Sequence, residues 1–201
     1  MPSPEAGVDL RQVTYRVFQH PKCGTNDTGK VVAVTSSVPG EGVSYVAHLI
    51  CHELSGDAQG RTLYCSADSL ANATLETRER YDYASTAVGY WTLKSRQNGA
   101  RSAWDFNPLV RCARLERLRC EFDYVIVDCP AICGSCELSA LASLTDSVLL
   151  VVAAGKSTRQ QMLYAKQAIA DSGGWLQGCI LNRRTYPIPN LLYRMLKGGA
   201  R

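Results

Sequence analysis

The feature that most constrains this fold is an apolar strand that runs into a glycine-rich turn and then into a helical pattern. Residues 31 to 34 are Val-Val-Ala-Val, and residues 37 to 44 are Ser-Val-Pro-Gly-Glu-Gly-Val-Ser. From Ser44 to Gly56 the apolar residues Val46, Leu49, Ile50 and Leu54 recur at helical spacing. A strand, a tight turn and a helix in this order are the setting in which loop N–H groups bind phosphate.

The turn matches the pattern of a phosphate-binding loop at most positions. That pattern is Gly, four residues, then Gly-Lys-Ser/Thr; the loop N–H groups surround phosphate oxygens, the Lys offsets their charge and the hydroxyl holds Mg²⁺. Here Ser37 stands at the first Gly, Gly42 and Ser44 are in place, and Val43 occupies the Lys position. The sequence therefore predicts a phosphate cradle without its cation, formed by Gly40, Glu41, Gly42, Val43 and Ser44.

The rest of the chain alternates strand and helix patterns. Strands are predicted at residues 30–36, 61–67, 122–128, 146–153 and 176–181, and helices at 8–19, 44–56, 109–119, 138–144 and 158–172. Residues 70 to 108 carry a weak pattern, which we interpret as a variable and partly helical segment with one short strand near 87 to 93. Alternation at this spacing predicts βαβ units with right-handed crossovers. The expected fold is α/β: a doubly wound, mostly parallel sheet flanked by helices, as in P-loop NTPases.

Length and composition fit one domain with a substantial core. The chain has 201 residues, of which 46% are hydrophobic, and we expect a single P-loop domain over residues 1–201. Residues 1–29 are expected to form an N-terminal helix and linker, and residues 183–201 a basic tail. After Asp171 there is no acidic residue, and five basic ones follow (Arg183, Arg184, Arg194, Lys197 and Arg201). This tail suits an anionic membrane surface or an acidic protein, or serves only solubility.

The cysteine count and the length of the apolar runs indicate in which cellular compartment the protein is expected. Nine cysteines, an odd number without paired spacing, favour a reducing cytoplasm over a secreted disulfide framework. The N-terminus has no apolar signal core, and the longest apolar run, residues 148 to 154, is far shorter than the roughly 20 residues that span a bilayer. We expect a cytoplasmic protein that reaches a membrane through a partner or its surface.

Two aspartates at strand ends are the candidates for metal and catalytic chemistry. The strand at 122–128 ends in Asp128, and a strand-end carboxylate of this kind contacts Mg²⁺ directly or through water. Mg²⁺ is therefore expected between Ser44 and Asp128. Asp68 lies just past the strand at 61–67, at the edge where parallel sheets bind ligands. A plain role for Asp68 as a helix cap or turn residue stays open.

Two further patterns invite a functional interpretation. Cys129, Cys133 and Cys136 lie close together, but no second pair completes a four-ligand zinc site, so buried packing residues are favoured over a metal or redox site. Residues 155 to 158, Gly-Lys-Ser-Thr, imitate the end of a P-loop, yet no Gly-rich turn precedes them. We predict a strand-to-helix loop there, with Ser157 or Thr158 as the helix N-cap.

The helix at 109–119 carries an alternation of apolar and basic residues. Its Leu109, Cys112, Leu115 and Leu118 are expected to face inward, and Arg111, Arg114, Arg117 and Arg119 to face water.

Taken in order, residues 36–44, 66–68, 122–130 and 149–156 resemble successive motifs of the bacterial tyrosine kinase family of exopolysaccharide systems, which belongs to the deviant-Walker P-loop ATPases. The resemblance implies ATP or ADP with Mg²⁺ as ligand and an adenine near Asn182. It implies an inner-membrane polysaccharide co-polymerase or export protein as partner, a cytoplasmic position peripheral to that membrane, and no nucleic acid. Self-association into a homo-oligomer is left open.

The sequence departs from this family in four places. In the family the loop is Pro-Gly-Glu-Gly-Lys-Ser and the second strand ends Asp-Ala-Asp, whereas here Val43 replaces the Lys and Ser66 the first Asp. The family's tyrosine-rich tail is reduced to Tyr186 and Tyr193, and its N-terminal Glu/Arg/Arg spacing is not clean around Arg11 and Arg16.

These departures favour a catalytically degraded, regulatory or docking component in which nucleotide binding is weak or absent. One alternative is an active tyrosine autokinase or ATPase in which another cation replaces the Lys. A partitioning or positioning protein of the same fold has less support, because its additional Lys near the loop start is absent: Ser36 and Ser37 stand there.

Overall fold

The computed structural model describes residues 10–18, 29–57, 60–72, 83–94, 108–133 and 136–183. These residues include a seven-stranded sheet with the order β3-β4-β2-β5-β1-β6-β7. Neighbouring strands pair in parallel, except that β3 and β4 are antiparallel. The strands are β1 (Lys30–Ser36), β2 (Thr62–Ser66), β3 (Tyr83–Ser85), β4 (Trp91–Leu93), β5 (Tyr124–Asp128), β6 (Ser147–Ala153) and β7 (Leu176–Asn182).

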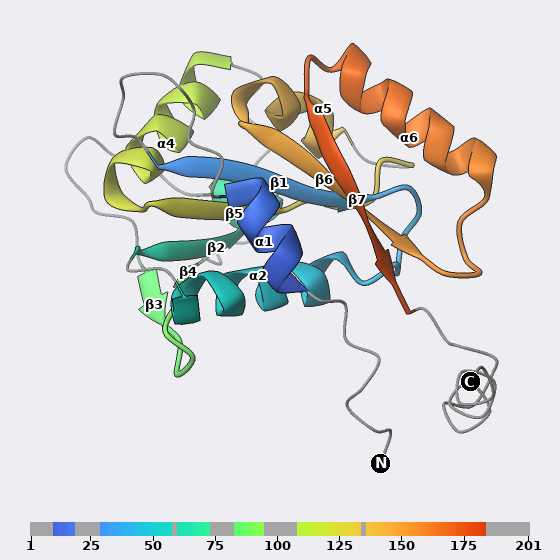
Figure 1. Ribbon diagram of the computed structural model, residues 1–201. Helices are drawn as coiled ribbons and strands as arrows, with labels where there is room; N and C mark the ends of the chain where they lie inside the picture. The colour runs from blue at the N-terminus through green and yellow to red at the C-terminus, as the bar shows by residue number, and fades with distance from the viewer. Residues whose placement is uncertain are drawn as a thin grey trace, which may run out of the picture.

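Helices cover both faces of this sheet (Figure 1). Helices α4, α5 and α6 pack on one face and bury Leu118, Leu141 and Ile169 against it, whereas α1 and α2 pack on the other. The described helices are α1 (Leu10–Phe18), α2 (Val43–Asp57), α3 (Ala67–Asn72), α4 (Pro108–Glu121), α5 (Glu137–Leu141), a 3₁₀ turn η2 (Ala142–Leu144) and α6 (Arg159–Asp171). The predicted doubly wound, mostly parallel α/β fold is confirmed.

Strand β1 occupies the centre of the sheet, between β5 and β6. Its residues 31 to 34 are fully buried, because a strand covered by helices on both faces has no polar side. The register aligns Val34 of β1 and Ser66 of β2 with Asp128 of β5. The carboxyl ends of these three strands therefore meet at one edge, where the loop after β1 also lies.

The segment between β2 and α4 differs from the prediction. Instead of one short strand, β3 and β4 form an antiparallel hairpin at the sheet edge, and the short helix α3, to which the sequence pattern assigns no range, follows β2 directly. Each of these strands has only three residues, which is too short for a hydrophobic periodicity to be recognised in the sequence.

The predicted inward and outward faces of α4 are wrong at three positions. Leu109 is 77% exposed, whereas Arg114 is only 8% exposed and donates from Nη1 to the carbonyl oxygens of Leu70 (3.3 Å) and Ala71 (2.8 Å). These carbonyls lie in the last turn of α3, where a helix lacks intrahelical donors. Arg119, predicted to face water, has a side chain that is 10% exposed.

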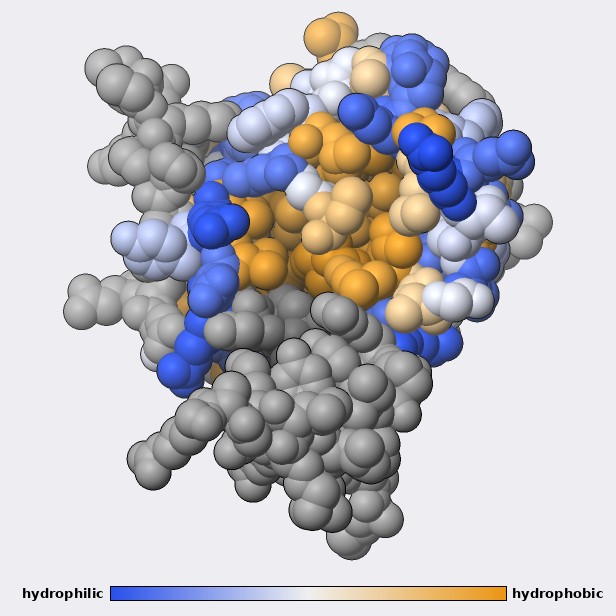
Figure 2. Space-filling view, turned by 45° about the vertical axis from the view of Figure 1, so that its right-hand side comes forward, coloured by the Kyte–Doolittle hydropathy of each residue, from blue (hydrophilic) through white to orange (hydrophobic). Residues whose placement is uncertain are grey.

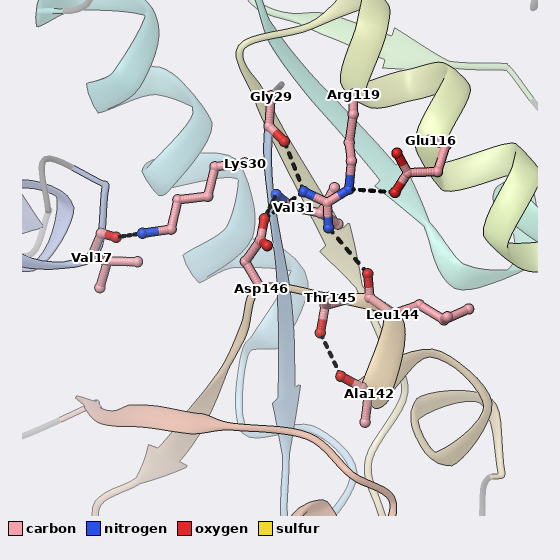
Figure 3. Close-up of polar contacts among 10 residues, drawn as sticks. All are labelled: Val17, Gly29, Lys30, Val31, Glu116, Arg119, Ala142, Leu144, Thr145 and Asp146. Carbon is pink, nitrogen blue, oxygen red and sulfur yellow. Dashed lines mark hydrogen bonds and ion pairs between the residues drawn. The ribbon is translucent and has the colours of Figure 1, made fainter. Parts of the chain in front are cut away.

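Arg119 closes the amino edge of the sheet (Figure 3). Its Nη1 donates to Asp146 Oδ2 at 2.6 Å and to the Gly29 carbonyl at 2.8 Å, and its Nη2 donates to the Leu144 carbonyl at 3.1 Å. Asp146 Oδ2 also accepts from the Val31 N–H at 2.8 Å. This group ties α4, β1 and the start of β6 together at the end of the sheet opposite the loop.

Other features concern the surface. Among the described residues, no helix is both long and apolar enough to cross a membrane. Figure 2 shows a hollowed face on which hydrophobic residues gather, bordered by hydrophilic ones. Large hydrophobic residues that are well exposed include Tyr15, Tyr45, Leu163, Tyr164 and Trp175.

Several predictions lie outside the described residues. They concern the linker at 19–28 and most of the tail, namely Arg184, Tyr186, Tyr193, Arg194, Lys197 and Arg201. The organisation of residues 1–201 as a single domain stays a prediction.

Candidate functional site

The loop between β1 and α2 borders a pocket of about 400 Å³ at the carboxyl edge of the sheet. Its lining includes Gly40, Gly42, Val43, Ser44 and Asp128, so the structure brings most of the predicted site residues together. Helix α2 begins at Val43, and the first N–H groups of a helix have no intrahelical partner. The positive end of the α2 dipole therefore meets the pocket, as anion binding requires.

The position that would hold the P-loop lysine carries Val43, the first residue of α2. Val43 is partly buried and packs against the apolar cluster that α1 and α2 form with the sheet. None of the described residues that line the pocket is Lys, Arg or His. The pocket lining thus offers backbone N–H groups and hydroxyls to an anion, but no positive charge.

Glu41 is fully buried and holds the loop from within. Its Oε2 accepts from the N–H and the hydroxyl of Ser37 (3.0 and 2.9 Å) and from the Val38 N–H (3.1 Å). Its Oε1 accepts from the Ala153 N–H (2.8 Å) and the Ser157 hydroxyl (2.6 Å). The Glu41 side chain, which belongs to the predicted phosphate cradle, is directed into the protein and joins the loop to the segment after β6.

The hydrogen bonds to Glu41 also set its charge. Burial raises the pKa of a carboxyl, but the bonds from Ser157, Ala153, Val38 and Ser37 together outweigh it, and the pKa of Glu41 lies below its ordinary value. Glu41 is therefore an anion at neutral pH that neutral donors satisfy.

Asn182, at the end of β7, contacts the loop from the other side. Its Nδ2 donates to the Glu41 carbonyl at 2.8 Å, and its Oδ1 accepts from the Arg183 N–H at 2.9 Å. Gly42 has φ of +92°, and a Cβ there would collide with the Asn182 amide, so only glycine fits. The described contacts of Asn182 shape the loop; its predicted contact with adenine stays a prediction.

Asp128 forms a hydrogen bond that sequence reasoning missed. The hydroxyl of Tyr64, in β2, donates to Asp128 Oδ2 at the end of the neighbouring strand β5, at 2.7 Å. The Tyr64 ring stacks on His48 of α2 with centroids 4.0 Å apart, and His48 Nδ1 lies 2.9 Å from the Tyr90 hydroxyl. Burial, together with this bond to the Asp128 carboxylate, raises the pKa of Tyr64, so its hydroxyl stays a donor. Among the described contacts, Oδ2 of Asp128 accepts this hydrogen bond and Oδ1 accepts none.

The side chains of Ser44 and Asp128 are chemically suited to bind a magnesium ion. Both line the same pocket, one with a hydroxyl at the start of α2 and the other with a carboxylate that is 9% exposed. Hard oxygen ligands of this kind, completed by water and substrate phosphate, are those that Mg²⁺ prefers. These two residues would hold the ion, which would offset phosphate charge.

Asp68 does not line the described pocket. It lies in the first turn of α3 and is exposed. Ser66, at the position of the family's first Asp, accepts from the Ser69 N–H at 3.0 Å and contacts the Ser69 hydroxyl at 2.7 Å. Ser66 thereby caps the start of α3, which is a structural role.

The three clustered cysteines differ in environment. Cys129 is buried, and burial, followed by the charge of Asp128, raises the pKa of its thiol well above the usual value. Cys133 and Cys136 are exposed, so the prediction of buried packing residues is wrong for these two. No group of three or more metal ligands occurs within the described part of the chain. Because its pKa is raised, the Cys129 thiol is not of the low-pKa, reactive kind.

The segment from β6 to α6 is a strand-to-helix loop, as predicted. Thr158 is the N-cap of α6 and forms a capping box with Gln161. Ser157 is instead bound to Glu41, and its Oγ also lies 2.8 Å from the Ser37 hydroxyl. The imitation of a P-loop end at 155–158 thus packs against the real loop, a proximity that local sequence patterns do not reveal.

Comparisons with known proteins bear on part of the sequence and on the fold. No family model matches the chain. A segment of 69 residues, 34% of the chain, is 32% identical to the tyrosine-protein kinase CpsD of Streptococcus pneumoniae serotype 4 and 35% identical to CpsD of Streptococcus agalactiae. The matched segment spans only 30% of the length of each relative.

Solved structures share the fold over most of the chain. The VpsO kinase domain has a TM-score of 0.69 at 19% identity, with 88% of this chain and 93% of that one covered. The kinase domain of Escherichia coli tyrosine kinase ETK has a TM-score of 0.70 at 16% identity, with 90% and 76% covered. The resemblance to bacterial tyrosine kinases is confirmed in part of the sequence and in the fold.

One further structural neighbour was solved with a ligand. A cobyrinic acid a,c-diamide synthase from Mycobacterium smegmatis, described with a bound ATP analog and magnesium, has a TM-score of 0.60 at 16% identity, with 84% of this chain and 78% of that one covered. A protein of this fold thus holds an ATP analog and magnesium in that structure.

Proposed function

We propose that this chain is a catalytically degraded, tyrosine-kinase-like P-loop protein that acts as a regulatory or docking component of exopolysaccharide synthesis and export. The observation that carries the proposal is Val43, which lines the pocket at the first position of α2, where the loop pattern requires Lys. A loop lysine neutralises phosphate charge both in the bound nucleotide and in the transition state. By analogy with arginine fingers, loss of such a cation costs about 10³-fold or more in rate.

The contacts of two further positions support the loss of chemistry. Ser66 stands at the family's first Asp position and caps α3, so it provides no carboxylate. Asp128 keeps its carboxylate, but one of its oxygens holds the Tyr64 hydroxyl. A site with one carboxylate and no loop cation is a poor catalyst of phosphoryl transfer, although its preformed loop suits a phosphate.

Docking is proposed on the basis of the resemblance. In this proposal the partner is an inner-membrane polysaccharide co-polymerase or export protein, and the chain is cytoplasmic and peripheral to that membrane. ATP or ADP with Mg²⁺ binds weakly at residues 40–44, Ser44 and Asp128, and its presence or absence regulates docking. Further copies of the chain in a homo-oligomer are compatible with this role, and no nucleic acid takes part.

An active tyrosine autokinase or ATPase is the second candidate. One observation favours it: Lys156, outside the loop, places its ammonium group against Gly40. A cation from another segment would restore part of the missing charge. Activity and binding must therefore be measured separately.

The test is a turnover assay on the full chain. We expect negligible ATP hydrolysis and no Mg²⁺-dependent transfer of labelled phosphate to the protein. Val43→Lys should tighten nucleotide binding, because the loop is otherwise intact. His52→Lys, which adds the same charge at an exposed position of α2, is the matched control and should leave binding unchanged. Robust incorporation of label into the unaltered chain would refute the proposal in favour of the autokinase.

A further inference from the structure

The turn between β6 and α6 brings a lysine against the phosphate-type loop. Lys156 Nζ lies 2.7 Å from the position that a Cβ on Gly40 would take. Gly40 has φ of +76° and lines the pocket. An ammonium group therefore occupies the space beside Gly40 that a side chain would otherwise fill.

Residues on both sides of Lys156 are anchored to the loop. The Ala153 N–H and the Ser157 hydroxyl both donate to Glu41 Oε1, at 2.8 and 2.6 Å. Between them the Lys156 N–H donates to the Ala153 carbonyl at 3.1 Å and closes a turn. The position of Lys156 beside Gly40 thus follows from the hydrogen bonds that also hold the loop.

The ammonium group has no other described role. In the residues that the structure describes, Lys156 is exposed and neither a hydrogen bond nor an ion pair engages its Nζ. The two carboxylates at this edge, Glu41 and Asp128, are bound by neutral N–H and O–H donors. Without Lys156 this edge has an excess of negative charge, which opposes the binding of a phosphate.

We propose that Lys156 supplies the positive charge that the loop lacks at Val43, by contacting the terminal phosphates of a nucleoside di- or triphosphate held at residues 40–44. The inference rests on the proposed function and deepens it: the nucleotide is still bound although its phosphate is not transferred. A lysine is a point charge on a flexible stem, so its ammonium has only to turn from Gly40 toward the pocket that Gly40 lines.

The experiment compares dissociation constants for ATP and ADP, each with Mg²⁺, by titration calorimetry on the full chain. Lys156→Gln should weaken binding about tenfold or more, the scale of a lost hydrogen bond to a charged group. Lys156→Arg should keep most of the affinity. Lys166→Gln, which removes the same charge from an exposed position within α6, should have no effect and serves as the matched control.

Two additional probes identify the ligand. AMP lacks the terminal phosphates, so its affinity should not change in Lys156→Gln. Inorganic phosphate should bind more weakly than ATP; equal affinity, lost in the same variant, would assign the site to free phosphate and overturn the assignment to nucleotides.

A double substitution tests whether Lys156 replaces the loop lysine. If it does, Val43→Lys should rescue Lys156→Gln to at least the affinity of the unaltered chain. Equal affinities in the unaltered chain and Lys156→Gln, or no saturable binding of ATP and ADP to the unaltered chain, would overturn the inference. Turnover by the unaltered chain would instead refute the proposed function, while a loss of binding in Lys156→Gln would still support the role of Lys156.

Discussion

The two ends of the central strand β1 each hold a buried carboxylate, but they satisfy it in different ways. At the amino end, Asp146 accepts from the Val31 N–H and forms a 2.6 Å ion pair with Arg119. At the carboxyl end, Glu41 accepts three N–H and two O–H bonds and has no cation among its described partners. At the amino end the carboxylate is neutralised by a cation, whereas at the carboxyl end it is stabilised by neutral N–H and O–H donors alone among the described residues.

This difference explains how the loop keeps its shape without its lysine. Glu41 orders the backbone of Ser37 and Val38 and the end of β6, and none of these bonds involves position 43. A substitution at Val43 therefore removes charge from the site without removing a support of the loop. The structure of the loop and its chemistry are separable, and the following predictions test that separation.

The largest effect is expected at the amino end, for Asp146→Ala. This change leaves the Arg119 guanidinium, 10% exposed, without its buried counter-charge, and the Val31 N–H without its acceptor. Breaking a buried ion pair from one side costs about 3–5 kcal/mol in the free energy of unfolding. Urea unfolding followed by circular dichroism measures it. Glu116 is a second carboxylate paired with Arg119, and its side chain is 58% exposed. Glu116→Ala should therefore cost only a few tenths of a kcal/mol in the free energy of unfolding, roughly the value for surface pairs.

A smaller loss is expected at the carboxyl end, for Glu41→Gln. The amide keeps the size of the side chain but turns an NH₂ group toward donors that need an acceptor, which leaves buried N–H groups unpaired. We expect a loss of about 1–3 kcal/mol and a weaker affinity for nucleotide, because the loop loses its internal support. Glu53→Gln, also on α2, is the control, since its carboxylate makes one ion pair with Arg11 at 3.7 Å. A loss as large as that of Asp146→Ala would contradict the contrast between the two ends.

The pH dependence of that loss follows from the lowered pKa of Glu41. A group whose pKa is lower in the folded protein stabilises it fully above its unfolded pKa, about 4.3 for Glu. The contribution is lost as the pH falls through the lowered folded pKa. The difference in stability between the unaltered chain and Glu41→Gln should therefore be constant from neutral pH to about pH 5 and shrink below about pH 4. A difference that grows on acidification would show that the pKa of Glu41 is raised instead.

The sequence predicts the sheet and the loop well because their patterns are local. Strand β1 was expected at residues 30–36 and spans Lys30–Ser36, since both its faces are buried and its apolar run is unbroken. The loop residues and Asp128 meet at one pocket because parallel strands place their carboxyl ends on one edge.

Contacts between distant segments could not be predicted in the same way. Tyr64 and Asp128 are 64 residues apart in sequence, and nothing in the strand pattern of β2 shows which group a tyrosine reaches. The burial of Arg114 depends on the end of α3, a helix that no periodicity revealed. Arginine fits either a wet or a buried helix face, because its stem is apolar and its five donors can meet carbonyl oxygens.

The smallest effect is expected for Tyr64→Phe, which tests whether the carboxyl end retains metal chemistry. The change removes the O–H that donates to Asp128 Oδ2 at 2.7 Å but keeps the ring that stacks on His48. Stability should fall by only about 1 kcal/mol, since the pocket lets water replace the lost donor. With both oxygens of Asp128 available, the dependence of nucleotide affinity on Mg²⁺ should increase, and calorimetric titrations with and without Mg²⁺ measure this.

Tyr90→Phe removes a hydroxyl that contacts His48 rather than Asp128 and is the matched control. If Tyr64→Phe left the Mg²⁺ dependence unchanged while Asp128→Asn abolished it, Asp128 would bind the ion through Oδ1 alone, and Tyr64 would only orient its carboxylate. If neither change had an effect, the carboxyl end would resemble the amino end, with a carboxylate that serves the fold and no metal.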